Sequence, residues 1–148
     1  MSSFRVIIPC FQEQEKVSNQ LIQLPNVPHR PMEVVVVDGA TDQACRKVCK
    51  QYGARWLADE PCRGRQLLSG AALAQGYVLW FLHADARLPP DPIMAMKFAI
   101  EQGAMGCYFR FRFDTPRSCP AVFRVPSMPL RFRSGLPFGA QGLLPAPR

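Results

Sequence analysis

Four consecutive valines at residues 34–37 constrain the fold of this chain more than any other feature of its sequence. A strand that keeps one face in water alternates apolar and polar side chains, whereas a strand of a parallel sheet is buried on both faces and is apolar throughout. Neighbouring parallel strands also need a crossover connection, which is usually a helix. The valine run therefore predicts a parallel sheet built from alternating strands and helices.

The first hundred residues show this alternation. Strands are expected at residues 4–8, 32–37, 55–58 and 77–82, and helices at 13–24, 41–52, 66–74 and 90–102. Pro9 should stop the first strand, while Gly53 and Gly103 should close the second and fourth helices. Successive strand–helix units give right-handed crossovers with helices on both faces of the sheet. The predicted fold class is α/β and Rossmann-like, with a mostly parallel sheet.

A polar cluster follows each of the four predicted strands. These clusters occupy residues 10–13, 38–42, 59–65 and 83–87. The carboxyl ends of parallel strands meet at one edge of a sheet, and ligands of open α/β folds bind there. The coincidence of four clusters predicts a binding site at that edge.

The acidic and basic residues in these clusters have specific candidate roles. Asp38 ends the valine strand and would need a partner for its charge; a carboxylate there can accept hydrogen bonds from a ribose or a base edge. Asp42 by itself is better explained as a helix cap. Arg63 and Arg65 beside a helix N-terminus would form a phosphate-binding corner, although any short basic loop has the same composition.

The sequence His83-Ala84-Asp85 after the fourth strand is the most informative stretch. A carboxylate at this position suits Mg²⁺ or Mn²⁺ bridging a diphosphate, where the ion would neutralise charge on a leaving nucleotide. Taken alone, Asp85 is equally well explained as a turn former. For His83, a satisfied and partly buried histidine is the favoured interpretation over a metal ligand or a sugar contact.

Several classes of protein are excluded by what the sequence lacks. There is no Gly-x-Gly-x-x-Gly fingerprint, no phosphate-binding P-loop and no nucleophile elbow. Of the six cysteines, Cys45 and Cys49 share a helix face, but no second Cys/His pair completes a zinc set. No apolar run is long enough to cross a bilayer and no secretory signal is present, so we expect reduced thiols in the cytoplasm.

The C-terminal part of the chain is strongly basic. From Gly103 onward it has seven arginines against Asp114 alone, which is 7 − 1 = +6 of the net charge of +7. Such an arm could meet phosphates, nucleic acid or an acidic membrane surface. Since no nucleic-acid-binding fold is indicated, a solvated or partner-covered face is favoured, and peripheral membrane contact stays open.

Four segments, read in order, resemble the family 2 glycosyltransferases of the GT-A fold. They are residues 6–17 (VIIPCFQEQEKV), 33–42 (EVVVVDGATD), 63–91 (RGRQLLSGAALAQGYVLWFLHADARLPPD) and 134–144 (SGLPFGAQGLL). The sequence is most similar to the radical-SAM/selenodomain-associated subgroup, which has His-Ala-Asp in place of the usual Asp-x-Asp. The resemblance spans nearly the whole chain and implies the nucleotide-diphospho-sugar transferase fold.

The resemblance also implies roles for individual residues. Those implied to bind the nucleotide sugar are Pro9, Phe11, Glu13, Asp38, Arg65, His83 and Asp85. Asp38 would contact the base or ribose, and Asp85 would bind the divalent metal on the diphosphate. Arg65 would lie near the diphosphate, and residues 135–142 would belong to the acceptor side. The implied reaction is inverting transfer of a sugar from a nucleotide diphosphate to an acceptor hydroxyl.

The sequence also departs from the pattern of this family. The turn that begins at Asp38 is one residue shorter than usual, and Ala140 stands where the subgroup tends to have aspartate. The Glu-Asp pair that supplies the general base is expected beyond residue 148, so the chain is expected to be C-terminally truncated. We therefore divide it into a nucleotide-sugar-binding domain, residues 1–115, and a partial acceptor-side segment, residues 116–148.

Two hypotheses follow from this reading of the sequence. In the first, the chain is part of an active transferase; in the second, it is an inactive relic or a nucleotide-binding module, because general-base help is worth about 10²–10⁴-fold in rate. Apolar residues of the tail would be exposed by truncation, which favours association of copies. They are Phe123, Phe132, Leu136 and Phe138.

Overall fold

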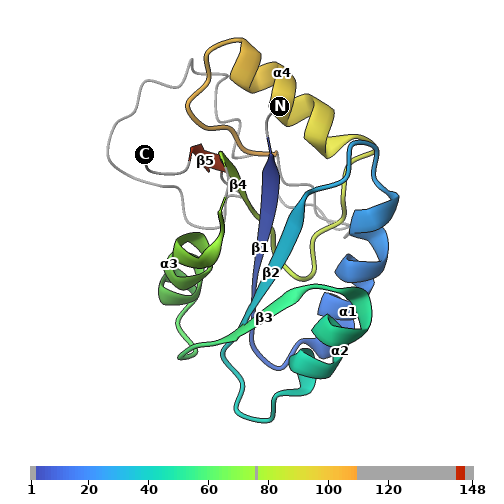
Figure 1. Ribbon diagram of the computed structural model, residues 1–148, viewed down its shortest axis with the longest axis vertical. Coiled ribbons are helices and arrows are strands. Elements are labelled where there is room, and N and C mark those ends of the chain that lie inside the picture. Colours follow the sequence, from blue (N-terminus) through green and yellow to red (C-terminus); the bar gives the residue numbers. More distant parts are fainter. Residues whose placement is uncertain (1–2, 76, 110–142, 146–148) are drawn as a thin grey trace, which may run out of the picture.

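The computed structural model describes residues 3–75, 77–109 and 143–145 (Figure 1). Its elements, in chain order, are β1 (Phe4–Cys10), α1 (Gln14–Gln23), a 3-10 turn η1 (Leu24–Asn26), β2 (Glu33–Asp38), α2 (Ala44–Tyr52), β3 (Arg55–Ala58), α3 (Arg63–Leu73), β4 (Val78–Phe81), α4 (Pro92–Glu101) and β5 (Leu143–Pro145). The alternation of aromatic and polar residues over 107–113 also predicts an amphipathic strand, which lies outside the described residues from residue 110 onward. The predicted domain boundary, the tail arginines and residues 135–142 lie outside them as well.

The strands form one sheet in the order β3-β2-β1-β4-β5. The first four strands in this order are parallel, and β5 pairs antiparallel with β4 at the edge. Strand β2 lies between two neighbours, and its residues 35–37 have no exposed surface. The valine run therefore predicts the parallel sheet correctly. The prolines of the C-terminal third predict loops and turns there, and this prediction is wrong at residues 143–145, which form the short strand β5.

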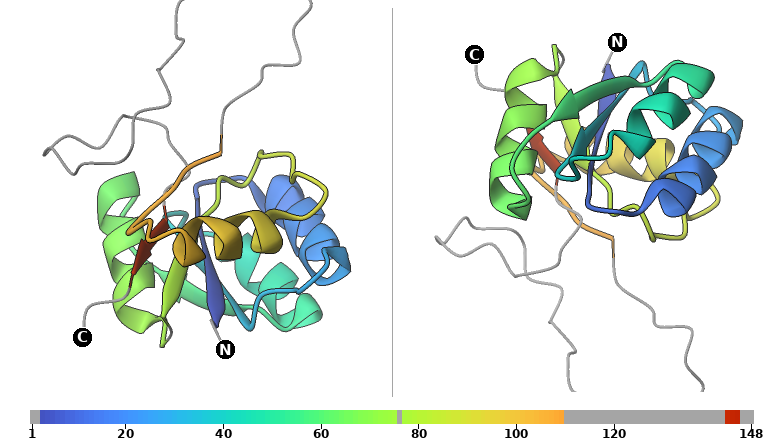
Figure 2. Two further views of the ribbon diagram at one scale, coloured as in Figure 1. Left: turned by 90° about the horizontal axis from the view of Figure 1, so that it is seen from above. Right: turned by 90° about the horizontal axis from the view of Figure 1, so that it is seen from below.

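Helices cover both faces of this sheet, as predicted (Figure 2). Helix α3 covers one face, where it packs over a buried cluster that includes Ile7, Val35 and Leu79. On the other face α1, α2 and α4 enclose a larger core around Ile8 and Trp80. Neighbouring residues of a strand point to opposite faces, so one apolar run supplies both cores.

Pro9 does not stop β1, which continues to Cys10, so this prediction is wrong. Along a parallel strand the peptide groups face the two neighbours in turn. The carbonyl of Cys10 accepts the amide of Gly39 after β2, and the carbonyl of Ile7 accepts the amide of Leu82 after β4. By this alternation the nitrogen of Pro9 faces the side of β4, which has already ended at Phe81. A proline, which lacks a donor, is tolerated there because the ladder between β1 and β4 ends at Ile7 and Phe81.

The helix ends follow local signals in most cases. Gly53 closes α2 with a positive φ of 72°, a conformation in which a side chain would be strained. Pro92 occupies the first turn of α4, and the carboxylate of Asp91 caps it by accepting the amide of Met94 at 3.0 Å. Helix α3 differs from prediction, because it begins at Arg63 rather than at Gln66. Both arginines of the predicted phosphate corner are therefore in its first turn.

Candidate functional site

The carboxyl ends of β1, β2 and β3 lie side by side. In the parallel register Cys10 pairs with Asp38, and Asp38 pairs with Ala58. Strand β4 pairs with β1 only up to Ile7 and Phe81, so β1 extends three residues further. The segment after β4 consequently lies beside the last residues of β1. The loops with the four polar clusters thus meet at one edge of the sheet, which we call the rim.

The residues His83-Ala84-Asp85 form a turn at this rim. The amide of Ala86 donates to the carbonyl of His83 at 3.1 Å, and Asp85 within the turn is exposed. The side-chain amide of Gln20, from α1, donates to the carbonyls of Ala86 and His83, the latter at 3.5 Å. Gln20 is only 2% exposed, so its amide holds the turn from the core side. The sequence analysis did not identify Gln20 as a site residue.

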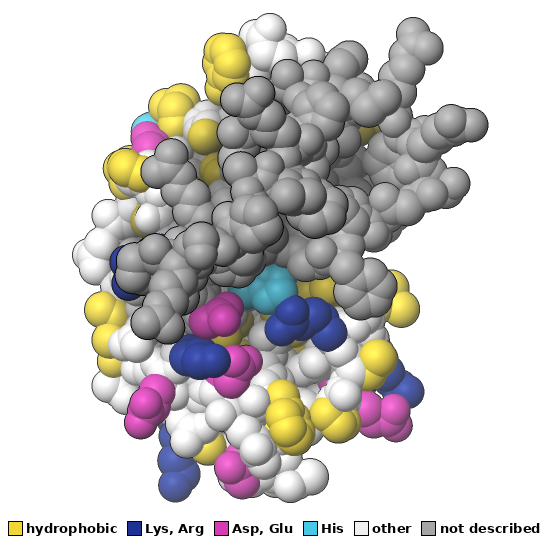
Figure 3. Space-filling view, turned by 180° about the vertical axis from the view of Figure 1, so that it is seen from behind, with side chains coloured by type: hydrophobic (Ala, Val, Ile, Leu, Met, Phe, Trp, Pro, Cys, Tyr) yellow, Lys and Arg dark blue, Asp and Glu magenta, His cyan; other side chains and the backbone are white. Residues whose placement is uncertain are grey.

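Charged side chains surround His83. Burial lowers the pKa of His83, and the nearby Arg63 guanidinium lowers it further, while Asp85 and Glu13 act in the opposite direction. Lys16, which contacts Glu13 at 2.7 Å, has a raised pKa because of that hydrogen bond and, to a smaller extent, because of Asp85. Acidic and basic side chains lie around a histidine on one face in Figure 3. His83 and Asp85 are therefore brought together with Glu13, as the sequence predicts.

Asp38 is at the rim but is completely buried. Its carboxylate accepts the indole N–H of Trp56 at 3.2 Å and the amide of Ala40 at 3.0 Å. The partners that we expected for this carboxylate are thus two N–H groups of the protein, the indole of Trp56 and the amide of Ala40. A direct contact of Asp38 with a nucleotide stays a prediction, and it requires the turn at Ala40 to open.

The remaining predicted residues occupy different surroundings. Pro9 is buried inside β1, whereas Phe11 is 49% exposed in the loop that follows. Arg65 makes ion pairs with Asp59 at 3.2 Å and with Glu60 at 2.8 Å. These two acidic residues of the loop between β3 and α3 therefore partly neutralise the charge of Arg65. Whether these residues contact a ligand stays a prediction.

Two polar residues of α3 complete the rim: Arg63, which belongs to the predicted phosphate corner, and Gln66, which was not predicted as a site residue. Arg63 lies near His83, as its effect on the pKa of His83 shows, although Arg65 was the predicted phosphate contact. Gln66 is buried, and its amide donates to the carbonyls of Cys10 at 2.8 Å and Val37 at 2.9 Å. This residue ties the ends of β1 and β2 to the first turn of α3.

The donor set at the His83 turn fits a hard or borderline divalent cation. The exposed carboxylate of Asp85 suits Mg²⁺ or Mn²⁺, while Glu13 and His83 lie nearby without forming a three-ligand cluster with it. Within the described residues only Cys10, Asp38 and Cys45 bring three potential ligand atoms within 4.8 Å of one another. Asp85 thus offers a single carboxylate. A Mg²⁺ ion held by one carboxylate takes further ligands from the phosphates of its substrate.

The fold and this rim define an α/β domain of the GT-A type. Residues 5–118 match the family described as Glycosyl transferase family 2, so the chain belongs to that family. No curated protein sequence matches the chain significantly. No helix among the described residues is long and apolar enough to span a membrane.

Three solved structures are similar to this fold. TarS of S. aureus gives a TM-score of 0.63 at 22% identity, over 80% of this chain and 23% of that one. The glucosyl-3-phosphoglycerate synthase of Mycobacterium tuberculosis, in complex with Mn²⁺, UDP and glucosyl-3-phosphoglycerate, gives 0.53 at 19% identity, over 68% and 39%. The mannosyl-3-phosphoglycerate synthase of Rubrobacter xylanophilus gives 0.52 at 16% identity, over 60% and 33%. This chain spans well under half the length of each.

Proposed function

We propose that this chain forms the nucleotide-diphospho-sugar-binding part of a glycosyltransferase. In this proposal Asp85 helps to hold a divalent metal on the diphosphate of the donor. The observation that supports it is the exposed position of Asp85 on a turn fixed by Gln20, beside Glu13 and His83. The membership of residues 5–118 in the family supports the same reaction class.

The first turn of α3 is the proposed phosphate contact. Backbone amides at a helix N-terminus are free to bind an anion, and an arginine beside them adds a forked donor. Arg63 is exposed and lies near His83, while Arg65 already pairs with Asp59 and Glu60. We therefore assign the diphosphate contact to Arg63 ahead of Arg65.

The chemistry that a bound Mg²⁺ or Mn²⁺ supplies is neutralisation of charge on the departing nucleotide diphosphate. The chain's own residues bind and orient the donor. A lowered pKa keeps His83 neutral at pH 7, so that it can present an imidazole nitrogen to the metal or to the sugar. The complex of the mycobacterial synthase contains Mn²⁺ and UDP, which supports this class of ligand.

Finer features of the function are proposed on the resemblance alone. They are an inverting displacement by an acceptor hydroxyl, and membership in the subgroup with His83-Ala84-Asp85 in place of Asp-x-Asp. The free thiols of the described cysteines support a cytoplasmic location.

Calorimetric titration tests the proposal. UDP-sugars and GDP-sugars should be titrated into the chain with and without Mn²⁺, and then into Asp85→Asn and Asp42→Asn. Asp42 is a matched control, because it is an exposed aspartate whose carboxylate accepts the amide of Ala44 at 3.1 Å, and asparagine keeps that bond.

We expect metal-dependent binding that is weakened about 10-fold or more by Asp85→Asn, since a ligand to the ion is lost, and unchanged by Asp42→Asn. Binding that is independent of Mn²⁺, or equally weakened in both variants, would contradict the assignment of Asp85.

A further inference from the structure

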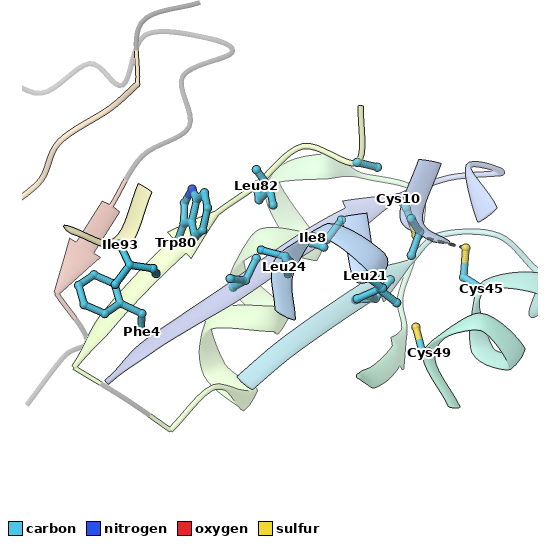
Figure 4. Packing of buried hydrophobic residues seen from close by; sticks show 14 of the residues in the cluster. Phe4, Ile8, Cys10, Leu21, Leu24, Cys45, Cys49, Trp80, Leu82 and Ile93 are labelled. Atoms are coloured by element: carbon cyan, nitrogen blue, oxygen red, sulfur yellow. Dashed lines mark hydrogen bonds between the residues drawn. The ribbon is translucent and has the colours of Figure 1, made fainter. Parts of the chain in front are cut away.

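Three potential metal ligands from separate elements meet in the core beneath the rim. They are the thiol of Cys10 at the end of β1, the carboxylate of Asp38 at the end of β2, and the thiol of Cys45 in the first turn of α2. Their ligand atoms all lie within 4.8 Å of one another, and each side chain is at most 3% exposed. Figure 4 shows the sulfurs of Cys10 and Cys45 turned toward each other, with Cys49 one helical turn away.

The charge of this cluster is unbalanced. The carboxylate of Asp38 accepts neutral donors from Trp56 and Ala40, and it forms no ion pair with any described residue. Burying a carboxylate without a cation is costly. The thiol of Cys10 donates to the sulfur of Cys45 at 3.6 Å, and the carboxylate of Asp38 has an oxygen within 4.8 Å of both sulfurs. Among the described residues this carboxylate thus has no direct cationic partner, and the sulfurs beside it are soft ligands that thiophilic metals prefer.

The spacing of the sulfurs fits metal ligation. Zinc–sulfur bonds of about 2.3 Å at a tetrahedral angle place two sulfurs about 3.8 Å apart. The sulfurs of Cys10 and Cys45 are 3.6 Å apart. A disulfide would need a separation of about 2.05 Å. The separation of the two sulfurs is therefore compatible with their binding the same ion.

We propose that Cys10, Asp38 and Cys45 bind a thiophilic divalent cation of the Zn²⁺ class. The two thiols each release a proton to solvent when the ion binds, and no oxidation or reduction takes place. The ion would join the ends of β1 and β2 to the start of α2, so its role is structural. It is distinct from the metal proposed at Asp85. That site is exposed, and none of its proposed ligands is a sulfur.

The burial of the cluster makes the ion a folding ligand. With all three side chains almost inaccessible, Zn²⁺ enters as the chain folds or when the rim opens locally. Bound Zn²⁺ should in turn stabilise the folded chain, because the unfolded chain has no preformed site.

The experiment starts from a chain in which Cys10, Cys45 and Cys49 are the only remaining cysteines. The substitutions Cys62→Ser, Cys107→Ser and Cys119→Ser remove three of the six cysteines. Cys45→Ala and Cys49→Ala are then compared in this background. Both residues are buried on α2 at 1% and 0% exposure, but Cys49 lies outside the ligand cluster and serves as the matched control.

Each reduced chain is refolded with Zn²⁺, desalted and assayed for bound metal, and Co²⁺ is used as a spectroscopic probe of thiolate ligation. We expect about one Zn²⁺ per chain in the background and in Cys49→Ala, and about one tenth or less in Cys45→Ala. The Co²⁺ complexes that form should show a sulfur-to-metal charge-transfer band. Asp38→Asn, whose single side-chain oxygen can replace only one of the two oxygens that accept from Ala40 and Trp56, should weaken Zn²⁺ binding about 10-fold or more.

Several outcomes would overturn the proposal. One is a folded background chain that binds no Zn²⁺ and gives no charge-transfer band. Another is equal loss of metal from Cys45→Ala and Cys49→Ala while circular dichroism shows both folded. A Cys10–Cys45 disulfide found by mass spectrometry in the freshly purified chain would also overturn it. Should Cys45→Ala not fold, the background chain and Asp38→Asn decide the question.

Discussion

The substitution Gly70→Ala tests how closely α3 lies on the sheet. A Cβ atom at Gly70 would lie 2.5 Å from the Cγ2 methyl of Ile7 and 3.0 Å from that of Val37. Both methyls belong to buried β-branched residues, which are stiff about χ1 and cannot swing aside. Helix α3 must therefore move away from the sheet, and Gln66 on the same helix must move with it.

The expected cost follows from two opposing effects. Overpacking a well-packed core costs about 1–3 kcal/mol. Replacing glycine by alanine in a helix returns about 0.5–1 kcal/mol through the lower conformational entropy of the unfolded chain. The free energy of unfolding should therefore fall by about 1–2 kcal/mol in Gly70→Ala. Gly64→Ala is the matched control, because a Cβ on that glycine of α3 meets no atom within 4 Å.

Equilibrium unfolding in urea, followed by far-ultraviolet circular dichroism, measures both variants. Gly64→Ala should be neutral or slightly stabilised, and Gly70→Ala should have a lower midpoint with an unchanged slope. If Gly70→Ala were as stable as Gly64→Ala, the close approach of α3 to β1 and β2 would be wrong. The position of Gln66 and Arg63 at the rim would then need revision as well.

Three further predictions concern the rim. Trp56→Phe removes the indole donor from the buried carboxylate of Asp38 and should lower the free energy of unfolding by about 1–3 kcal/mol in urea; no loss would contradict that bond. Arg63→Gln should raise the pKa of His83 in an NMR titration, because it removes a neighbouring positive charge. An unchanged pKa would show that the side chains of Arg63 and His83 are not close to each other. The folded chain holds the pKa of His83 below its usual 6.5, so below pH 6.5 the unfolded chain binds a proton that the folded chain does not. Stability should therefore fall as the pH drops below 6.5, and a chain with His83→Gln should show a smaller fall in the same unfolding assay.

The features predicted correctly from the sequence depend on local physics. A run of valines is compatible with a strand buried on both faces, and Gly53 and Pro92 mark helix ends through their own backbone preferences. The meeting of the four polar clusters at one edge also follows, because the carboxyl ends of parallel strands face the same edge of a sheet; ligand binding at that edge stays a prediction. The resemblance indicated Arg65 rather than Arg63 as the diphosphate contact. Residues two apart on a helix point in different directions, so the observed start of α3 was needed to show which of the two lies near His83.

The features that were missed depend on partners far away along the chain. Pro9 is tolerated within β1 because β4 is short, and a local rule about proline contains no information on a neighbouring strand. Gln20 looks like a surface residue of an amphipathic helix, yet it is buried against a turn 63 to 66 residues later. Cys10 and Cys45 are 35 residues apart, so spacing rules for metal ligands did not join them.

The central claim is that the rim near Asp85 binds a nucleotide diphosphate together with a divalent metal. Paramagnetic broadening of amide NMR signals by Mn²⁺, recorded with and without UDP, tests it most directly. With UDP present, the signals of Glu13, Arg63 and Asp85 should broaden strongly, while that of Gly53, at the opposite end of the strands, should stay sharp. Broadening centred on Gly53, or broadening that is the same with and without UDP, would contradict the claim.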